Sequence, residues 1–276
     1  MNPVGVMQGR LVPRIGDRIQ AFPWERWEEE FETAKACGFD SIEFIFEADR
    51  SDENPIYTSG GIKKVRGLID KTGIPVSSIC ADYFMEHPFF RVPEEAKKES
   101  ADVLISLISM SSQAGVRLIE IPCVDQSAIK TEEDKAELIK YVSSALPAAE
   151  KHGVAISLET SLPPLEFREL IERFNHPLMA VNFDIGNSAS MGYEPGFEIK
   201  TLGPFIANIH IKDRILHGGT VPLGEGNADF PAVFKALKGI SYKGPFILQT
   251  ARDADDAGVA KKYLGMVRNY IKEYGL

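Results

Sequence analysis

The chain has 276 residues, 44% of them hydrophobic and 26% charged, and a formal net charge of −9. This acidic balance disfavours binding to nucleic acid backbones, while a local basic pocket for a small anion stays open. The chain has three cysteines and no C-x-x-C spacing, which argues against a disulfide framework or a structural zinc site. It has no recognisable signal peptide and no apolar run of about 18 residues, so a cytoplasmic protein is expected.

Short apolar segments alternate along the chain with longer amphipathic segments. Glycines end several amphipathic segments, as they do at helix C-termini, and Pro93 with two following glutamates suits a first helical turn. Eight strands are expected at Val4–Gln8, Ser41–Phe46, Pro75–Ala81, Arg117–Ile121, Val154–Glu159, Met179–Asp184, Phe205–Ile211 and Pro245–Thr250. Helices are expected at Trp24–Cys37, Gly61–Lys71, Pro93–Ala114, Thr131–Lys151, Pro164–Phe174, Phe197–Leu202, Phe230–Leu237 and Asp255–Glu273.

Eight strands, each followed by a helix, predict an α/β fold with a single (β/α)8 barrel domain over residues 1–276. The main alternative is a doubly wound open sheet, which usually has a glycine-rich phosphate-binding turn after its first strand, and none follows the first strand here. In such barrels the reacting side chains project from the C-terminal ends of the strands. The polar residues that close the strands are therefore the candidate site residues.

Four of these residues close four successive strands: Glu159, Asp184, His210 and Gln249. One imidazole nitrogen together with oxygen ligands suits a divalent ion such as Mn²⁺, Mg²⁺, Co²⁺ or Zn²⁺. The two carboxylates, those of Glu159 and Asp184, follow strongly apolar strands, where burying a carboxylate without a cation would be costly. The alternative is that each acid caps a helix or pairs with a lysine, which is less favoured for four residues at successive strand ends than for one alone.

Further residues are candidates for contacts with a substrate. Lys212 and His87 could bind hydroxyl or anionic groups, and Arg10 and Arg252 could hold a carboxylate or phosphate, which a guanidinium group matches in geometry. For each basic residue the alternative is a surface salt bridge. His87 belongs to the loop EHPFF, whose aromatic side chains are expected to be exposed. The long segment 7–24 is expected either to cover the mouth of the barrel or to contact another subunit.

The motifs SLET, NFDIGN, NIHIKD and GPFILQT surround the four strand-end residues, and PLGEGNADF follows the seventh strand. In order and spacing, this set resembles the xylose isomerase-like sugar-phosphate isomerases and epimerases over nearly the whole chain. That superfamily includes tagatose and psicose 3-epimerases, hydroxypyruvate isomerases, inosose-processing enzymes and endonuclease IV. The resemblance implies a sugar isomerase or epimerase in which Glu159, Asp184 and His210 bind a metal ion and Glu159 is also an acid/base residue.

Two positions depart from the pattern of that family. Gln249 stands at a metal-binding and catalytic position that is usually glutamate, and Asn187, a candidate substrate contact, stands where histidine is frequent. A glutamine oxygen can bind a metal, but glutamine cannot take up a proton. Epimerisation normally needs a proton-transferring group on each face of an enediolate, whereas 1,2-isomerisation can use one, so the sequence favours an isomerase with Glu159 as the base. The residues that could replace the missing base are Glu43, Glu120 and Asp213.

Three alternative functions are consistent with the same sequence. A nuclease related to endonuclease IV would need three zinc ions and many histidines, whereas only His210 and His87 qualify here. A non-catalytic descendant that binds a sugar or sugar acid is consistent with Gln249 and Asn187. A dehydratase or decarboxylating enzyme would use the same enolate chemistry. For the favoured function the partner is a small sugar-derived molecule, with no nucleic acid or membrane, and relatives often form homo-oligomers.

Overall fold

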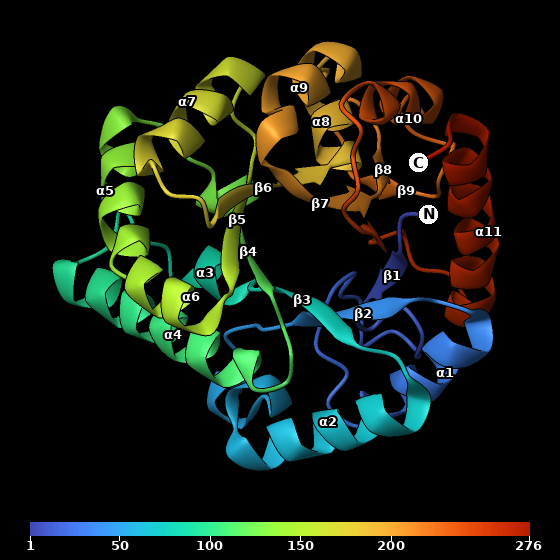
Figure 1. Cartoon of the computed structure of the whole chain (residues 1–276), viewed down its shortest axis with the longest axis horizontal. Coiled ribbons are helices and arrows are strands. Elements are labelled where there is room, and N and C mark those ends of the chain that lie inside the picture. Colours follow the sequence, from blue (N-terminus) through green and yellow to red (C-terminus); the bar gives the residue numbers. More distant parts are fainter.

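The structure is a computed structural model that describes residues 1–276. Eight parallel strands close into a barrel in the order β1-β10-β7-β6-β5-β4-β3-β2, and Figure 1 shows helices surrounding them. The strands of the barrel are β1 (Val4–Met7), β2 (Ser41–Ile45), β3 (Val76–Cys80), β4 (Leu118–Cys123), β5 (Ala155–Thr160), β6 (Met179–Asp184), β7 (Ile206–Ile211) and β10 (Phe246–Leu248). The predicted (β/α)8 barrel is therefore confirmed.

The helices follow the predicted order, with one division and two additions. The predicted helix over Thr131–Lys151 is two helices, because Pro147 has no amide hydrogen to continue the first one. The helices are α1 (Glu29–Cys37), α2 (Ser59–Thr72), α3 (Tyr83–Glu86), α4 (Glu94–Ser112), α5 (Glu132–Ser143), α6 (Leu146–His152), α7 (Pro164–Phe174), α8 (Ile185–Met191), α9 (Pro195–Leu202), α10 (Phe230–Gly239) and α11 (Asp256–Tyr274). None of them is long and apolar enough to cross a bilayer.

Strand β2 shows how the barrel separates an apolar outer layer from a polar interior. Successive side chains of a strand point to opposite faces. Phe44 points outward, where its ring lies 6.1 Å from Phe31 of α1. Its neighbour Glu43 points inward and hydrogen-bonds Ser78 and Asn208 of other strands. The hydrophobic core therefore lies between the strands and the helices, and the interior of the barrel is left to polar groups.

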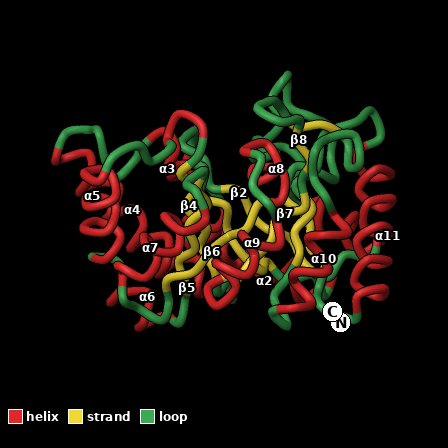
Figure 2. The backbone as a smooth tube through the Cα atoms, turned by 90° about the horizontal axis from the view of Figure 1, so that it is seen from above, coloured by secondary structure: helices red, strands yellow, loops and turns green.

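Short elements that the sequence did not predict lie at the C-terminal ends of the strands. They are α3, α8 and an antiparallel pair of strands, β8 (Asp213–Arg214) and β9 (Thr220–Val221). Figure 2 shows α3, α8 and β8 at one end of the barrel and both chain termini at the other. These elements surround the end of the barrel at which a catalytic site is expected.

The loop EHPFF differs from its prediction. Phe89 and Phe90 are each 1% exposed, and the Phe89 ring stacks on Phe84 with its centroid 4.8 Å away. Both rings are part of the hydrophobic core, and Phe89 contacts α3 through Phe84. The prediction of exposed aromatic side chains is therefore wrong.

Candidate active site

A cavity of about 460 Å³ opens at the C-terminal ends of the strands. Its walls are mainly polar, which suits a ligand with many hydroxyl groups better than an apolar one. The residues of the four predicted strand-end positions lie in the walls or directly beneath them. The polar lining includes Arg10, Arg18, Gln20, Glu47, Asp82, Glu120, Glu159, Asn187, Lys212, Arg214 and Gln249.

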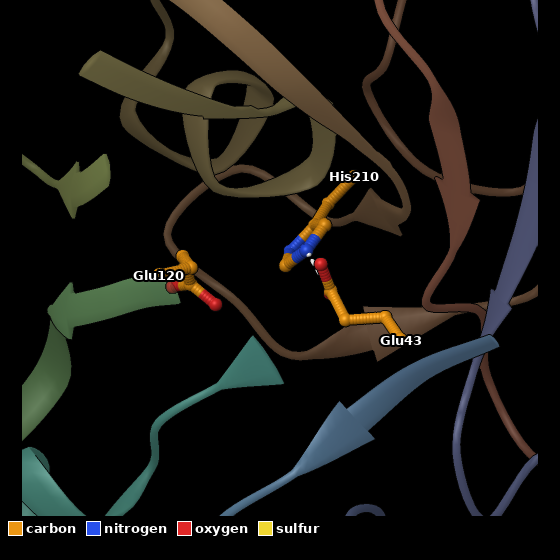
Figure 3. A group of neighbouring side chains, drawn as sticks. All are labelled: Glu43, Glu120 and His210. Carbon is orange, nitrogen blue, oxygen red and sulfur yellow. Dashed lines mark hydrogen bonds and ion pairs between the residues drawn. The ribbon is translucent and has the colours of Figure 1, made fainter. Parts of the chain in front are cut away.

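His210 lies at the centre of a buried group of carboxylates. Its Nδ1 atom is 3.3 Å from Oε2 of Glu159 and 3.9 Å from Oδ2 of Asp184, its partner in the β6–β7 register. On the other side of the ring, Nε2 lies 2.6 Å from Oε1 of Glu43 (Figure 3). When Nε2 donates to Glu43, the imidazole ring is oriented with Nδ1 toward the two acids. One atom each of Glu159, Asp184 and His210 could hold a metal ion.

The carboxylate of Glu159 is held on both of its oxygens. Asn182 donates to Oε2 at 2.6 Å, and Asn187 of α8 donates to Oε1. Arg214 in turn donates to Oδ1 of Asn187 at 2.7 Å, which orients the amide. Burial raises the pKa of Glu159, but hydrogen bonding and attraction to His210 outweigh it, so the net pKa lies below its usual value. Glu159 is therefore a fixed, ionised carboxylate in the cavity wall.

Lys212 reaches between two of the predicted metal ligands. Its Nζ atom is 3.2 Å from Oδ2 of Asp184 and 2.9 Å from Oε1 of Gln249. The lysine stem passes over Gly186, where an added Cβ would lie 2.8 Å from Cγ of Lys212. Burial lowers the pKa of Lys212, but the carboxylates of Asp184 and Glu159 more than offset it, so the amine is a cation.

The segment 7–24 contributes side chains to the cavity rather than lying apart from it. Gln20 accepts from Nε2 of Gln249 at 3.1 Å and from Nη2 of Arg10 at 3.2 Å. Its own amide nitrogen donates to Asp82 at 2.7 Å. Arg18 pairs with Glu47 on the same rim. The segment therefore borders the mouth of the barrel.

Two of the three candidates for a replacement base are already engaged. Glu43 contacts His210, Ser78 and Asn208 through its two oxygens. Asp213 accepts hydrogen bonds from three backbone amides of the loop after β9, those of Gly224, Gly226 and Ala228. That loop needs glycine where it wraps Asp213, since a Cβ on Gly226 would lie 2.1 Å from Oδ1 of the acid. Asp213 thus organises the loop.

Glu120 is the third candidate and is free. It is fully buried, both of its oxygens are without a hydrogen-bond partner, and it lines the cavity. Figure 3 shows it across from Glu43 and His210 in the barrel interior. Burial, together with the negative charge of Glu159, raises its pKa well above the usual value for glutamate. Of the three candidates, Glu120 is thus the one whose carboxyl group has no hydrogen-bond partner.

Two predicted substrate contacts lie outside the cavity. His87 is exposed and stacks on Tyr83, with ring centroids 4.5 Å apart. Arg252 donates to both oxygens of Asp256, at 3.0 and 2.8 Å, and to the carbonyl of Val12. The other predicted contacts, Arg10, Asn187 and Lys212, line the cavity.

The structure adds three residues that sequence reasoning missed. Asn182 precedes Asp184 by two positions, so strand alternation was a signal that it faces the interior as well. Gln20 lies in an irregular connection and Arg214 in the two-residue strand β8, and neither segment is long enough in regular structure for a periodic pattern to indicate a direction.

The comparisons with known proteins agree with the family expected from the motifs. The model of the xylose isomerase-like TIM barrel family matches residues 31–270. A putative L-ribulose-5-phosphate 3-epimerase, SgbU of Haemophilus influenzae, is 28% identical, over 86% of this chain and 88% of its own length. The L-ribulose-5-phosphate 3-epimerase UlaE of Escherichia coli O1:K1 / APEC is 25% identical, over 96% of both chains.

Solved structures share the fold over nearly their full length. An L-ribulose 3-epimerase superposes with a TM-score of 0.79 at 18% identity, covering 99% of this chain and 96% of its own. The D-psicose 3-epimerase of Clostridium cellulolyticum H10, solved with D-tagatose, has a TM-score of 0.77 at 16% identity, covering 98% and 99%. At these identities the likeness establishes the barrel fold.

Proposed function

The chain belongs to the xylose isomerase-like TIM barrel family, and we propose that it is an enzyme that moves a proton next to the carbonyl group of a small sugar or sugar phosphate. The observation that carries the proposal is the Glu159 carboxylate, which two asparagines hold in the cavity beside His210 and Asp184. The names of the relatives, sugar-phosphate 3-epimerases, support the same class of substrate.

In this proposal Glu159 is the general base. A positioned carboxylate contributes about 10²- to 10⁴-fold to such a reaction. Because both of its oxygens are hydrogen-bonded by Asn182 and Asn187, its direction toward the substrate is set before the substrate binds. The ammonium group of Lys212, in the same cavity, stabilises the negative charge that develops on the substrate oxygen as the enediolate forms.

The residues present fit a divalent cation such as Mn²⁺, Mg²⁺, Co²⁺ or Zn²⁺. Glu159, Asp184 and Nδ1 of His210 would hold it, and Glu43 supplies the outer hydrogen bond that metal-binding histidines usually have. Gln249 offers a neutral oxygen that Lys212 already engages. When bound, such an ion polarises the oxygens of the substrate.

We favour 3-epimerisation over the 1,2-isomerisation that the sequence suggested. The isomerase prediction depended on the lack of a second base, since Gln249 cannot carry a proton. Glu120 has a free carboxyl group in the same cavity, and it is the second group that a two-base epimerase requires. Arg10, Asn187 and Lys212 are proposed to contact the substrate or the base.

Proton NMR in D₂O tests the proposal. Ketopentoses, ketohexoses and their phosphates are incubated with the protein and Mg²⁺ or Zn²⁺, with Mn²⁺ left out because it broadens proton signals. The incubation is repeated with EDTA. Deuterium entering at C3 with inversion is the expected result, and EDTA is expected to suppress it. Exchange at C1 or C2 would instead identify an isomerase, and loss of water or carbon dioxide would identify the dehydratase or decarboxylase alternatives.

A matched pair of variants checks that the exchange belongs to this site. Glu159→Gln is expected to lower the exchange rate by about 10²- to 10⁴-fold. Glu169→Gln changes an exposed glutamate of α7 in the same way and is expected to keep the wild-type rate. Exchange that survives in Glu159→Gln would overturn the assignment of the base, and the absence of exchange in the wild-type protein with every sugar would favour a non-catalytic sugar-binding protein.

A further inference from the structure

Arg10 is a buried arginine in the cavity wall without an acidic partner. It lies in the segment after β1 and is 4% exposed. Nε donates to the carbonyl of Thr250 at 3.1 Å, and Nη2 donates to Gln20 at 3.2 Å. Nη1 is buried and has no hydrogen-bond partner. Both partners of Arg10 are neutral, so nothing in direct contact balances its charge.

Two other arginines of this region have their charges balanced by acids, whereas Arg214, also in the cavity wall, donates to the carbonyl of Gly218 and to the amide oxygen of Asn187. Arg18 pairs with Glu47, and Arg252 forms two hydrogen bonds with Asp256. Burial, and then the positive charge of Arg252, lower the pKa of Arg10 to about 10, so its guanidinium is still a cation at neutral pH. A buried cation is costly unless an anion compensates it.

The acids nearest to Arg10 are committed to other groups. Asp82 accepts from Gln20 and from the thiol of Cys80, at 2.7 and 3.3 Å. Glu30 accepts from the backbone amides of Gly9 and Leu11, at 2.7 and 3.2 Å. Neither forms an ion pair with Arg10. The guanidinium therefore has an uncompensated charge and an unpaired, buried donor that an anion from outside the protein could satisfy.

Arg10 is connected to the chemical centre by a row of hydrogen bonds along the cavity. It shares the oxygen of Gln20 with Gln249, and Gln249 in turn contacts Lys212. Arg10, Glu159 and Lys212 line the same cavity of about 460 Å³. A small molecule with its carbonyl group at Lys212 and Glu159 could therefore reach Arg10 with a group distant from its reacting carbon.

We propose that Arg10 binds an anionic group of the substrate, a phosphate or a carboxylate carried by the sugar away from its carbonyl group. This inference rests on the proposed function and makes its substrate more specific, namely an anionic sugar. Arginine suits the role because its planar group can present two N–H donors to the oxygens of one phosphate or carboxylate.

Kinetics with paired substrates test the inference. Arg10→Gln is expected to raise KM for a ketopentose 5-phosphate by about 10- to 100-fold, which is the range for a hydrogen bond to a charged group. It is expected to raise KM for the unphosphorylated ketopentose much less. Arg10→Lys keeps the charge but not the planar group, and its KM for the phosphorylated sugar is expected to lie between those of the wild type and Arg10→Gln. Arg14→Gln, an exposed arginine of the same segment that pairs with Asp17, is the matched control and is expected to resemble the wild type.

The two sources of the anion are separated by a third substrate, a ketose acid with a terminal carboxylate. A larger Arg10→Gln effect on the phosphate identifies a sugar phosphate, and a larger effect on the acid identifies a sugar acid. Equal effects of Arg10→Gln on neutral and anionic sugars would overturn the inference. If Arg10→Gln does not fold, KM of Arg10→Lys and of the wild type are compared on the same neutral and anionic sugars, and equal effects on both kinds of sugar would again overturn the inference.

Direct binding distinguishes failure of the inference from failure of the proposed function. Calorimetry with inorganic phosphate in EDTA requires neither turnover nor a metal ion. Binding to the wild type that Arg10→Gln weakens at least 10-fold, without turnover of any sugar, would keep the anion site and refute the proposed function. Turnover of sugars with phosphate binding that Arg10→Gln leaves unchanged would refute the anion site alone.

Discussion

The ammonium nitrogen of Lys212 lies 2.9 Å from Oε1 of Gln249 and 3.2 Å from Oδ2 of Asp184. A cation of the protein therefore lies between the ends of β10 and β6. The amide of Gln249 also donates to Gln20, whose own amide nitrogen is directed at Asp82. The amide of Gln249 donates to the oxygen of Gln20 and accepts from the ammonium group of Lys212. A carboxylate has no N–H to donate, so at this position it would require Gln20 to reorient.

Replacing Gln249 by glutamate changes the charge of the candidate metal site. Gln249→Glu is expected to bind Mn²⁺ about 10-fold more tightly, because one more negative ligand faces the cation. Calorimetric titration of the metal-free protein measures this. Gln249→Met, which has no oxygen, serves as the control and is expected to bind Mn²⁺ no more tightly than the wild type. Unchanged affinity in Gln249→Glu would mean that residue 249 is not part of the metal site.

The position of Lys212 depends on a glycine. Gly186→Ala would place a Cβ 2.8 Å from Cγ of Lys212 and displace the lysine from Asp184 and Gln249. We expect kcat/KM to fall by about 10²-fold with the fold retained, since a displacement of about 1 Å has effects of this size. Gly67→Ala in α2 is the control, because its Cβ would meet nothing within 4 Å. Wild-type kcat/KM in Gly186→Ala would show that Lys212 is not required.

Glu120 is expected to act on only one of the two faces of the substrate. Glu120→Gln keeps the shape of the side chain and removes its exchangeable carboxyl proton. Interconversion of the two C3 epimers should then fall by about 10²- to 10⁴-fold, whereas Glu159 still exchanges deuterium into one epimer. NMR that follows exchange and inversion separately decides this. Undiminished inversion would remove Glu120 from the mechanism, and loss of both processes would mean that Glu120 is needed for binding.

Glu30 is expected to make stability depend on pH. Burial raises its folded-state pKa from 4.5 to about 7, despite the hydrogen bonds from Gly9 and Leu11. Between these pH values the folded state keeps a proton that the unfolded state has released. The contribution of Glu30 to the free energy of unfolding is therefore complete below pH 4.5 and decreases as the pH rises toward 7. The loss is about 3 kcal/mol from this group.

Urea unfolding between pH 4 and 8 measures that loss. Glu30→Gln cannot ionise and is expected to flatten the profile across this range, while its amide oxygen can still accept from the Gly9 and Leu11 amides. Glu29→Gln, the exposed neighbour that pairs with Arg26, is the control and should keep the wild-type slope. An unchanged slope in Glu30→Gln would show that Glu30 is ionised in the folded protein throughout.

Much of the fold could be predicted because its signals are local. The segments Pro164–Phe174 and Met179–Asp184 match the structure at both ends, since apolar periodicity and flanking prolines act within a few residues. The helix α8 was missed because it begins directly after Asp184, which caps it by accepting from the amide of Asn187. Capping a helix and pairing with a lysine were the alternatives to metal binding for this acid, and Asp184 does both, since it also contacts Lys212.

The sequence by itself determined the barrel, the order of its strands and the four residues that close strands β5, β6, β7 and β10, because each depends on neighbours along the chain. Only the tertiary structure decided how these residues are used. Glu43 and Asp213 are engaged by His210 and by a loop, whereas Glu120 and Arg10 have buried polar atoms without a hydrogen-bond partner. These differences arise from contacts between segments far apart in sequence, and no local pattern encodes the distances between them.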